Sequence, residues 1–377
     1  MNWIKNQIDK SISFTVSSIR KQQKRNLAGQ KRQSTHKMLQ DLPQPELSAA
    51  EKQEISAYWS QFGIEIKDYC WFQWYYGITG IKDPRFIPQE IYLYTVLPYY
   101  NRREFIPAYK DKNSFDLRLP AKHFPKTVVR RMSGDFYDKD GVYITSDVKN
   151  DRLVDTILAH RQVIGKNAID SSRGINVKKY EISSRQDVLA LLESWTAPDY
   201  IIQEIVHQHP FFAQFNESSV NIIRINSWYH NGEVTLSTPV LRFGMPGYST
   251  DVCFINGEEI VRLVGIKDDG TIRDTVVHMS GKTQRVEEIC SDPIRQVPAW
   301  DKITAMVKEN AGKLYHFHLI GWDVTLTEDN QPITIEYNIT QPSSYSSQMT
   351  DGPMWGEHTS QLLSFLKDEE NRRKYLL

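Results

Sequence analysis

LIGWDVTL at residues 319–326 precedes PITIEYN at residues 332–338, with the polar stretch TEDNQ between them. The two apolar, β-branched runs and the turn-forming residues that separate them predict a β-hairpin. With the turn centred on Asp329-Asn330, Asp323 faces Glu336 across the two strands, and Asn338 lies two residues further along the same face. The hairpin is therefore expected to carry three oxygen-bearing side chains close together.

These side chains favour a metal site. Like charges that face each other destabilise a sheet, so a positive charge is expected between Asp323 and Glu336. Three oxygen donors without His or Cys favour Mg²⁺ over zinc. The alternative is a solvated hairpin with an incidental acid pair, but both acids are embedded in apolar residues. If the two acids repel each other, neutralising either one should leave the unliganded chain at least as stable.

The composition is that of a folded globular protein, with 40% hydrophobic and 11% aromatic residues in a chain of 377. This length allows two or three lobes. Cys70, Cys253 and Cys290 are too widely spaced to indicate a Cys-x-x-Cys metal pair or a disulfide framework. The N-terminus lacks the apolar core of a signal peptide, and no apolar run approaches 18 residues. We therefore expect a cytoplasmic protein whose membrane contact, if any, is peripheral at the inner face.

Charge is distributed unevenly along the chain, although its formal net charge is zero. Residues 1–37 hold nine Lys or Arg and one acid, a net charge of +8. Apolar residues recur there at roughly helical spacing through Ile19, which is typical of a basic amphipathic helix on an anionic membrane surface. A helix packed on the protein's own body, followed by a disordered basic tail through Lys37, is an equal alternative. No nucleic-acid partner is expected, because no recognition motif accompanies this arm.

The rest of the chain predicts an α+β fold. Ser48-Ala49-Ala50-Glu51 has the pattern of a helix capping box. The aromatic run YCWFQWYY at residues 69–76 could line a sugar-binding cleft, but aromatic clusters more often form core. From residue 124, short strands and helices lack the regular alternation of a doubly wound sheet. The expected parts are a basic arm and linker (1–50), an aromatic-rich segment (51–110), a first lobe (111–205) and a second lobe with the metal site (206–377).

Three further motifs have the chemistry of a nucleotide site. Lys166 ends an apolar strand before the small-residue loop at 170–174, where loop N–H groups and the ammonium could hold a phosphate. Gln203-Glu204-Ile205-Val206 is a strand whose edge groups could pair with an adenine ring. Arg224 alternates with apolar neighbours on another strand and suits a phosphate contact. An internal ion pair of Arg224 is the alternative.

The order of these motifs resembles that of the ATP-grasp superfamily: a strand Lys, a small-residue loop, a Gln-Glu hinge, a strand Arg, then Asp and Glu-x-Asn. The similarity runs from about residue 111 to about residue 367. More narrowly, several stretches resemble the sugar-transfer-associated ATP-grasp proteins found with bacterial polysaccharide gene sets. These stretches are QEIVHQHP (203–210), SVNIIR (219–224), LRFG (241–244), VPAW (297–300), GWD (321–323) and IEYN (335–338).

The resemblance implies two α+β lobes that clamp ATP between antiparallel sheets. It assigns phosphate contacts to Lys112 and Lys166, and a loop over the phosphates to Ser172 and Gly174. It assigns the adenine hinge to Gln203, Glu204, Ile205 and Val206. It makes Arg224 and Lys166 the catalytic cations at the triphosphate, and it assigns Mg²⁺ to Asp323, Glu336 and Asn338. The sequence departs from the family pattern in its phosphate loop, which has one glycine, and near residues 250–260, where the acceptor chemistry is expected.

The implied activity is that of an ATP- and Mg²⁺-dependent ligase. ATP would phosphorylate a carboxylate, and an amine would displace phosphate from the acylphosphate, with Mg²⁺, Lys and Arg stabilising the transferred group. The expected substrates are a sugar acid or glycan precursor and an amino acid or amine, joined in surface polysaccharide biosynthesis. Two alternatives use the same site: a kinase that phosphorylates a sugar hydroxyl, and a non-catalytic ATP-binding scaffold docked by residues 1–37 to a membrane glycan-assembly complex.

Overall fold

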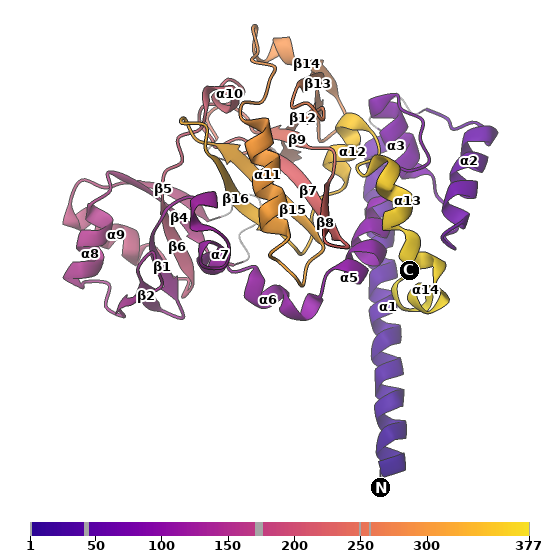
Figure 1. The fold of residues 1–377 in the computed structure, drawn as a ribbon, viewed down its shortest axis with the longest axis horizontal. Helices are drawn as coiled ribbons and strands as arrows, with labels where there is room; N and C mark the ends of the chain where they lie inside the picture. The colour runs from indigo at the N-terminus through magenta and orange to yellow at the C-terminus, as the bar shows by residue number, and fades with distance from the viewer. Residues whose placement is uncertain (1, 41–44, 170–175, 249, 256–257, 377) are drawn as a thin grey trace. The chain divides into compact units, whose positions relative to one another are not determined.

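The computed structural model describes residues 2–40, 45–169, 176–248, 250–255 and 258–376 (Figure 1). The chain divides into two compact units. The first comprises residues 1–101, 280–282 and 343–377, and the second comprises residues 102–279 and 283–342. The first expected lobe (111–205) lies within the second unit, as does most of the second lobe, whereas residues 343–377 group with the N-terminal unit. The predicted α+β class is confirmed, because the second unit contains two antiparallel sheets with helices packed on them.

The first unit is helical in its described part. A π-helical turn, Tyr92–Val96, joins α4 to α5 in one continuous helix. Its α-helices are α1 (Asn2–Gln40), α2 (Ala49–Ser60), α3 (Cys70–Thr79), α4 (Gln89–Ile91), α5 (Leu97–Tyr100), α12 (Tyr345–Asp351), α13 (Thr359–Leu362) and α14 (Glu369–Tyr375). No helix among the described residues combines the length and the apolar character needed to cross a lipid bilayer.

The C-terminal helices belong to this unit because polar side chains join them to its N-terminal part. The side-chain amide of Gln348 in α12 accepts a hydrogen bond from the Ile87 N–H at 2.7 Å and donates one to the Ile87 carbonyl at 2.9 Å. The Tyr100 hydroxyl donates to the Leu362 carbonyl at 2.8 Å. The amide of Gln348 is buried, so both hydrogen bonds are needed to compensate its desolvation.

Helix α1 includes the predicted basic arm and continues to Gln40, so the segment through Lys37 is helical rather than a disordered tail. Ala28, Thr35 and Leu39 are buried on one face of its C-terminal half. On the same part of the helix, His36 Nε2 lies 2.8 Å from Asp68 Oδ2. The described basic side chains of α1, from Arg20 to Lys37, are exposed or half-buried, and the sequence contains no acidic residue from Lys10 to Gln40.

The aromatic run at 69–76 is core, as the more common behaviour of such clusters predicts. Trp71, Phe72, Trp74, Tyr75 and Tyr76 in α3 are all buried. Tyr75 stacks on Phe86 with ring centroids 4.9 Å apart. The predicted capping box of α2 is also present, with the Ser48 hydroxyl accepting from the Glu51 N–H and the Glu51 carboxylate accepting from the Ser48 N–H. Among the described residues, these rings therefore serve packing.

The smaller sheet of the second unit has six antiparallel strands. Its strands, in spatial order, are β3 (Tyr143–Thr145), β2 (Asp135–Tyr137), β1 (Thr127–Met132), β6 (Tyr200–Glu204), β4 (Gln162–Asn167) and β5 (Val177–Glu181). Helices α8 (Asp151–Leu158) and α9 (Arg185–Glu193) bury their apolar faces against this sheet (Figure 1). Ser184 caps α9, and Trp195 completes this core.

The larger sheet has eight strands. Seven follow the order β14 (Thr283–Arg285), β13 (Ile272–His278), β12 (Arg262–Ile266), β9 (Val240–Phe243), β7 (Ile222–His230), β15 (Leu319–Leu326) and β16 (Pro332–Asn338), while β8 (Glu233–Leu236) pairs with β7. Ile303, Met306 and Val307 of α11 (Trp300–Ala311) belong to its core. The remaining elements are α6 (Ile106–Tyr109), α7 (Phe115–Arg118), α10 (Pro210–Ala213), and the hairpin of β10 (Cys253–Ile255) and β11 (Glu258–Ile260).

The apolar stretch at residues 234–243 suggests one strand, but the structure divides it into β8 and β9. Both segments pair with β7, β8 alongside Ser227–His230 and β9 alongside Ile222–Arg224. The Ser237 hydroxyl accepts a hydrogen bond from the Asn226 N–H at 3.0 Å, where the chain leaves β8. Pro239 follows and has no N–H to donate to a ladder, which explains why the strand is interrupted.

The hairpin of β15 and β16 confirms that Asp323 faces Glu336. Near the turn, however, Val324 pairs with Thr334 and Leu326 pairs with Pro332, one residue away from the register expected for a turn centred on Asp329-Asn330. A β-bulge between Asp323 and Val324 on the β15 side absorbs this difference by inserting Ile335 as an extra residue in β16. The predicted acid pair is therefore correct, although the turn centre is shifted.

Candidate functional site

One face of the smaller sheet presents lysines in an apolar setting. Lys166 of β4 pairs with Val177 of β5, and Ile164 pairs with Lys179, and all four side chains line the same cavity. The intervening Gly165 faces the opposite side, where a Cβ atom would lie 2.7 Å from the Trp195 ring. Because strand side chains alternate, packing of Trp195 against Gly165 directs Lys166 into the cavity.

The end of β6 provides a second wall. Val163 pairs with Glu204, the last residue of β6, and the chain leaves the sheet at Ile205 and Val206. The side chains of Glu204, Ile205 and Val206 line the cavity, whereas the side-chain amide of Gln203 donates to the Pro125 carbonyl at 3.2 Å. The Glu204 carboxylate lies 3.4 Å from Lys126 Nζ and 3.7 Å from His160 Nδ1. Residues 204–206 therefore form the junction between β6 and the loop that follows it, where a hinge is expected.

The larger sheet contributes the acids. Asp323 of β15, and Ile335 and Glu336 of β16, line the cavity. An unbroken strand would direct Ile335 and Glu336 to opposite faces, so the bulge at Ile335 explains why both reach the same cavity. The carboxylates of Asp323 and Glu336 therefore meet the lysines of the smaller sheet within the second unit.

Each of the two acids has its own cation. Arg224 Nε donates to Asp323 Oδ1 at 2.5 Å, and Arg224 Nη2 donates to Asp323 Oδ2 at 2.9 Å. Lys112 Nζ donates to Glu336 Oε1 at 2.9 Å. Burial opposes the charge of Arg224, but the carboxylate of Asp323 outweighs it and raises the pKa of the guanidinium. The positive charge expected beside the acid pair is thus supplied by two side chains.

The sequence-based site residues fall into four groups. Lys112, Lys166, Glu204, Ile205, Val206, Asp323 and Glu336 line the cavity. Arg224 and Asn338 lie behind Asp323 and hydrogen-bond to it, with Asn338 Nδ2 at 3.2 Å from Asp323 Oδ2. Gln203 points to Pro125. Ser172 and Gly174 lie outside the described residues, as does the rest of the loop at 170–175.

Two charged residues of the cavity were not identified from the sequence. Lys179 lies beside Ile164, and Asp251 lies on the side of the larger sheet, 3.2 Å from Arg242 Nη2. Burial raises the pKa of Asp251, and Arg242 opposes this shift. Side chains two residues apart on a strand point to the same face. The spacing of Val177 and Lys179 could therefore have placed Lys179 on the cavity face. Asp251 follows no such pattern, because it lies in a loop.

The residues present fit Mg²⁺. The side chains of Asp323, Glu336 and Asn338 offer only hard oxygen ligands and come from two adjacent strands. Their carboxylates are already neutralised by Arg224 and Lys112, and Lys166 adds further positive charge. A divalent cation alone is therefore not favoured at this position. A metal ion that arrives with an anionic ligand would restore the charge balance.

Two opposed antiparallel sheets with lysines on one and carboxylates on the other are the arrangement of an ATP-grasp fold. The family model described as "Sugar-transfer associated ATP-grasp" matches residues 155–360, which is more than half of the chain. The chain belongs to the sugar-transfer associated ATP-grasp family. The family match includes β4, β5, β6, β7, β15 and β16, the strands that line the cavity.

Solved structures with a similar fold include three enzymes. D-alanyl-alanine synthetase A from Vibrio cholerae is 13% identical, with a TM-score of 0.41 and coverage of 71% of this chain and 67% of that chain. The VanG D-Ala:D-Ser ligase from Enterococcus faecalis is 12% identical, with a TM-score of 0.42 and coverage of 71% and 62%. N5-carboxyaminoimidazole synthase from Aspergillus clavatus is 11% identical, with a TM-score of 0.34 and coverage of 64% and 46%. The comparison with curated proteins gives no match.

The ion pair between Arg224 and Asp323 leads to a prediction about stability. Both side chains are nearly inaccessible, at 7% and 12% exposure, so Asp323→Asn leaves a buried guanidinium without its counter-charge. We expect the free energy of unfolding, measured in urea, to fall by about 3 kcal/mol. Glu336→Gln should cost less, because the side chain of Glu336 is 30% exposed and solvent screens its charge. An Asp323→Asn protein as stable as the parent would support the original expectation of acid repulsion.

Lys166 leads to a prediction about protons. Burial, together with the nearby Lys112, lowers the pKa of Lys166 to about 8. At pH 8 about half of the unliganded molecules therefore carry a neutral Lys166, and an anionic nucleotide should draw about half a proton onto it. The uptake should vanish at pH 6.5, where Lys166 is already charged, and affinity should weaken above pH 8. Calorimetry of ADP binding in buffers of different ionisation enthalpy measures this uptake.

The matched control for this measurement is a permanently charged side chain at the same position. Lys166→Arg should bind ADP without pH-dependent proton uptake, because a guanidinium stays protonated. Lys149→Arg, at an exposed position, should behave like the parent. Equal uptake by the parent and Lys166→Arg would assign the proton to another group.

Proposed function

We propose that the protein is an ATP- and Mg²⁺-dependent ligase that joins a carboxylate to an amine through an acylphosphate. The observation that carries this proposal is the cavity of the second unit, where Lys112, Lys166 and Lys179 face the carboxylates of Asp323 and Glu336. Transfer of a phosphoryl group requires neutralisation of its negative charge and exclusion of water. The cavity has groups for both purposes.

The residues of the cavity divide this work. The ammonium groups of Lys112 and Lys166 would neutralise the phosphates, and Lys179 adds a third cation on the same sheet face. Ile164, Val177, Ile222 and Ile335 supply apolar walls that accept an aromatic base and exclude water. The hinge at Glu204–Val206 begins at the last paired residue of β6. The backbone N–H and C=O groups of the hinge could therefore bind the edge of the adenine ring. Asp323, Glu336 and Asn338 would hold Mg²⁺, which when bound neutralises phosphate oxygens.

Binding of nucleotide and metal requires an exchange of partners. In the unliganded protein Lys112 is paired with Glu336, and Arg224 is paired with Asp323. With a triphosphate bound, the ammonium of Lys112 would contact a phosphate oxygen. The carboxylate of Glu336 would then be available to hold the metal ion. Because charges are exchanged rather than newly buried, the desolvation cost of loading the site is reduced. This exchange favours joint binding of Mg²⁺ and nucleotide.

The substrate class rests on the family's association with sugar transfer. We propose that a sugar acid or glycan precursor supplies the carboxylate, that an amino acid or amine supplies the nucleophile, and that the product enters surface polysaccharide biosynthesis. Attack of ATP by the carboxylate releases ADP, and attack of the amine on the acylphosphate releases phosphate. A complete turnover therefore consumes both organic substrates.

Product analysis tests the reaction. With Mg²⁺-ATP and a panel of sugar acids paired with amino acids, we expect ADP, inorganic phosphate and an amide conjugate in equal amounts by mass spectrometry. Glu336→Gln should remove nearly all turnover, and most of the stabilisation of about 2.7 kcal/mol expected from Mg²⁺-ATP at a hundred times its dissociation constant. Glu328→Gln makes the same chemical change at an exposed position of the hairpin and should retain parental activity.

The outcomes separate the alternatives. Formation of a phosphorylated sugar without inorganic phosphate would identify a kinase. Tight binding of ATP without turnover on any acceptor pair would favour a scaffold. Near-parental turnover of Glu336→Gln would show that the metal site is misplaced.

We further propose that α1 docks the enzyme on the anionic cytoplasmic face of a membrane, near the glycan precursors. Support comes from the segment Lys10–Gln40, which is helical, holds eight Lys or Arg and lacks acidic residues. Exposed basic residues near an anionic surface each contribute about 1 kcal/mol at low salt, and less as salt screens them. The proposed contact is peripheral.

Vesicle sedimentation measures this contact. Four changes to Gln on α1, at Arg20, Lys21, Arg25 and Lys31, should weaken binding to vesicles containing phosphatidylserine by at least about tenfold and leave ATP turnover unchanged. The matched control carries four changes to Gln at exposed lysines of the second unit, Lys149, Lys267, Lys302 and Lys308. Equal loss in both variants would indicate a general charge effect, and parental binding of the α1 variant would exclude α1 as the docking element.

A further inference from the structure

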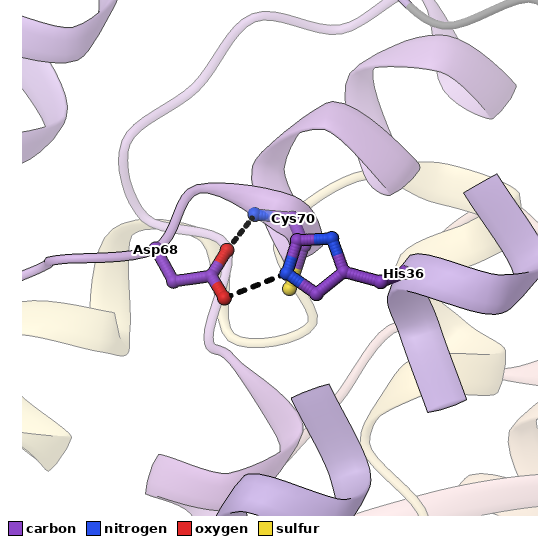
Figure 2. Close-up of side chains that lie close together, drawn as sticks. All are labelled: His36, Asp68 and Cys70. Atoms are coloured by element: carbon purple, nitrogen blue, oxygen red, sulfur yellow. Dashed lines mark hydrogen bonds and ion pairs between the residues drawn. The ribbon is translucent and has the colours of Figure 1, made fainter. Parts of the chain in front are cut away.

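Three potential metal ligands from two separate segments of the first unit lie close together (Figure 2). They are the imidazole of His36 on α1, the carboxylate of Asp68 and the thiol of Cys70 at the start of α3. One ligand atom from each residue lies within 4.8 Å of the other two. A tetrahedral zinc ion holds N, O and S ligands about 3.3–3.8 Å apart. The His36 and Asp68 atoms, which are 2.8 Å apart, would therefore open by about 0.5 Å, and the distances to the sulfur would close by at most about 1 Å.

Local structure holds these groups in place. Asp68 Oδ1 accepts a hydrogen bond from the Cys70 N–H at 2.9 Å, which fixes the carboxylate and leaves Oδ2 directed at the ring of His36 (Figure 2). Cys70 is fully buried, whereas the side chain of His36 is 53% exposed. The thiol therefore forms the closed side of the cluster, and the imidazole forms the side that opens to solvent. A water molecule can occupy a fourth position there.

One further carboxyl group and one guanidinium lie close to the cluster. Glu90 of α4 is 5% exposed, and burial raises the pKa of its carboxyl to about 7. Arg32 faces Glu90, with Nη1 3.9 Å from Glu90 Oε1. Burial, aided by Asp68 and Glu90, raises the pKa of the Cys70 thiol, so the sulfur has to lose a proton when it binds a metal ion.

We propose that His36, Asp68 and Cys70 form a binding site for a divalent transition-metal ion of the zinc type. A neutral imidazole, a carboxylate and a thiolate balance the charge of a divalent cation and match the N, O and S ligands that Zn²⁺ prefers. On binding, the S–H bond of Cys70 breaks, the sulfur binds the metal, and one proton leaves to solvent. The ion joins α1 to α3.

This site is chemically distinct from the Asp323–Glu336 pair of the second unit. That pair and Asn338 offer only oxygen ligands, which suit Mg²⁺, whereas Cys70 offers a soft sulfur ligand. The sequence alone did not indicate the site, because His36 is 32 residues from Asp68 and no Cys-x-x-Cys pair exists. Its function is structural: it fixes the C-terminal half of the basic helix α1 on the body of the first unit.

Cobalt binding tests the proposal directly. The untagged full-length protein, kept reduced with a phosphine, is titrated with Co²⁺ and followed by thiolate-to-cobalt charge-transfer absorption. We expect a band that saturates at one equivalent and is abolished by one equivalent of Zn²⁺, with release of one proton per Zn²⁺ bound. The Mg²⁺ site cannot produce this band, because it contains no sulfur.

Two variants and one control complete the test. Cys70→Ser should abolish the band, and His36→Gln, at an exposed side chain, should weaken Co²⁺ binding by more than about tenfold. Cys290→Ser, at a cysteine outside the cluster, should leave both the band and the affinity unchanged. A parent protein without a saturable band, a band that survives in Cys70→Ser, or parental affinity in His36→Gln would overturn the proposal.

Discussion

The buried ion pair between Arg224 and Asp323 is the interaction on which the candidate site depends. It joins β7 to β15 at directly opposed positions, and Asn338 of β16 donates to the same carboxylate. A buried guanidinium is tolerated only when its charge and its N–H groups are compensated, so Asp323 has little freedom to move. Three strands of the larger sheet thus converge on one carboxylate that also lines the cavity. The group that stabilises the sheet is the group that the proposed metal ion requires.

The smaller sheet supplies lysines to the cavity and the larger sheet supplies acids. A simple steric rule determines the direction of these side chains on each sheet. On the smaller sheet, alternation directs Ile164 and Lys166 into the cavity, while Gly165 leaves room for Trp195 on the other face. On the larger sheet, a bulge at Ile335 breaks this alternation and brings Ile335 and Glu336 to the same side. The lysines of the smaller sheet and the acids of the larger sheet therefore meet where the two sheets face each other. In the unliganded state they partly neutralise one another, which lowers the cost of keeping charged groups in an apolar cavity.

The first unit uses its aromatic residues and its polar groups for different purposes. Rings such as those of Tyr75 and Phe86 fill its core, and buried amides such as that of Gln348 join distant segments. The cluster of His36, Asp68 and Cys70 lies where α1 meets the start of α3. The basic residues of α1 continue beyond this point toward its N-terminus. Six of the nine Lys or Arg of α1 lie from Lys21 onward, in the half that packs on the first unit, and their side chains are exposed or half-buried. One face of this half can therefore be held by packing while its other face carries the charge for docking.

The sequence by itself determined the elements whose signal is local. Apolar, β-branched runs and turn residues identified the hairpin of β15 and β16, and the capping box identified α2. The expected turn placed Asp323 opposite Glu336, and the bulge at Ile335 keeps them opposed although the turn itself is shifted. Motif order identified the family and most of the cavity residues. Only the tertiary structure decided which charges neutralise one another, since Arg224 is 99 residues from Asp323 and Lys112 is 224 residues from Glu336. It also decided that the C-terminal helices join the N-terminal unit, and that His36 meets Cys70. Such contacts depend on how whole elements pack, and no periodicity within a single segment encodes them.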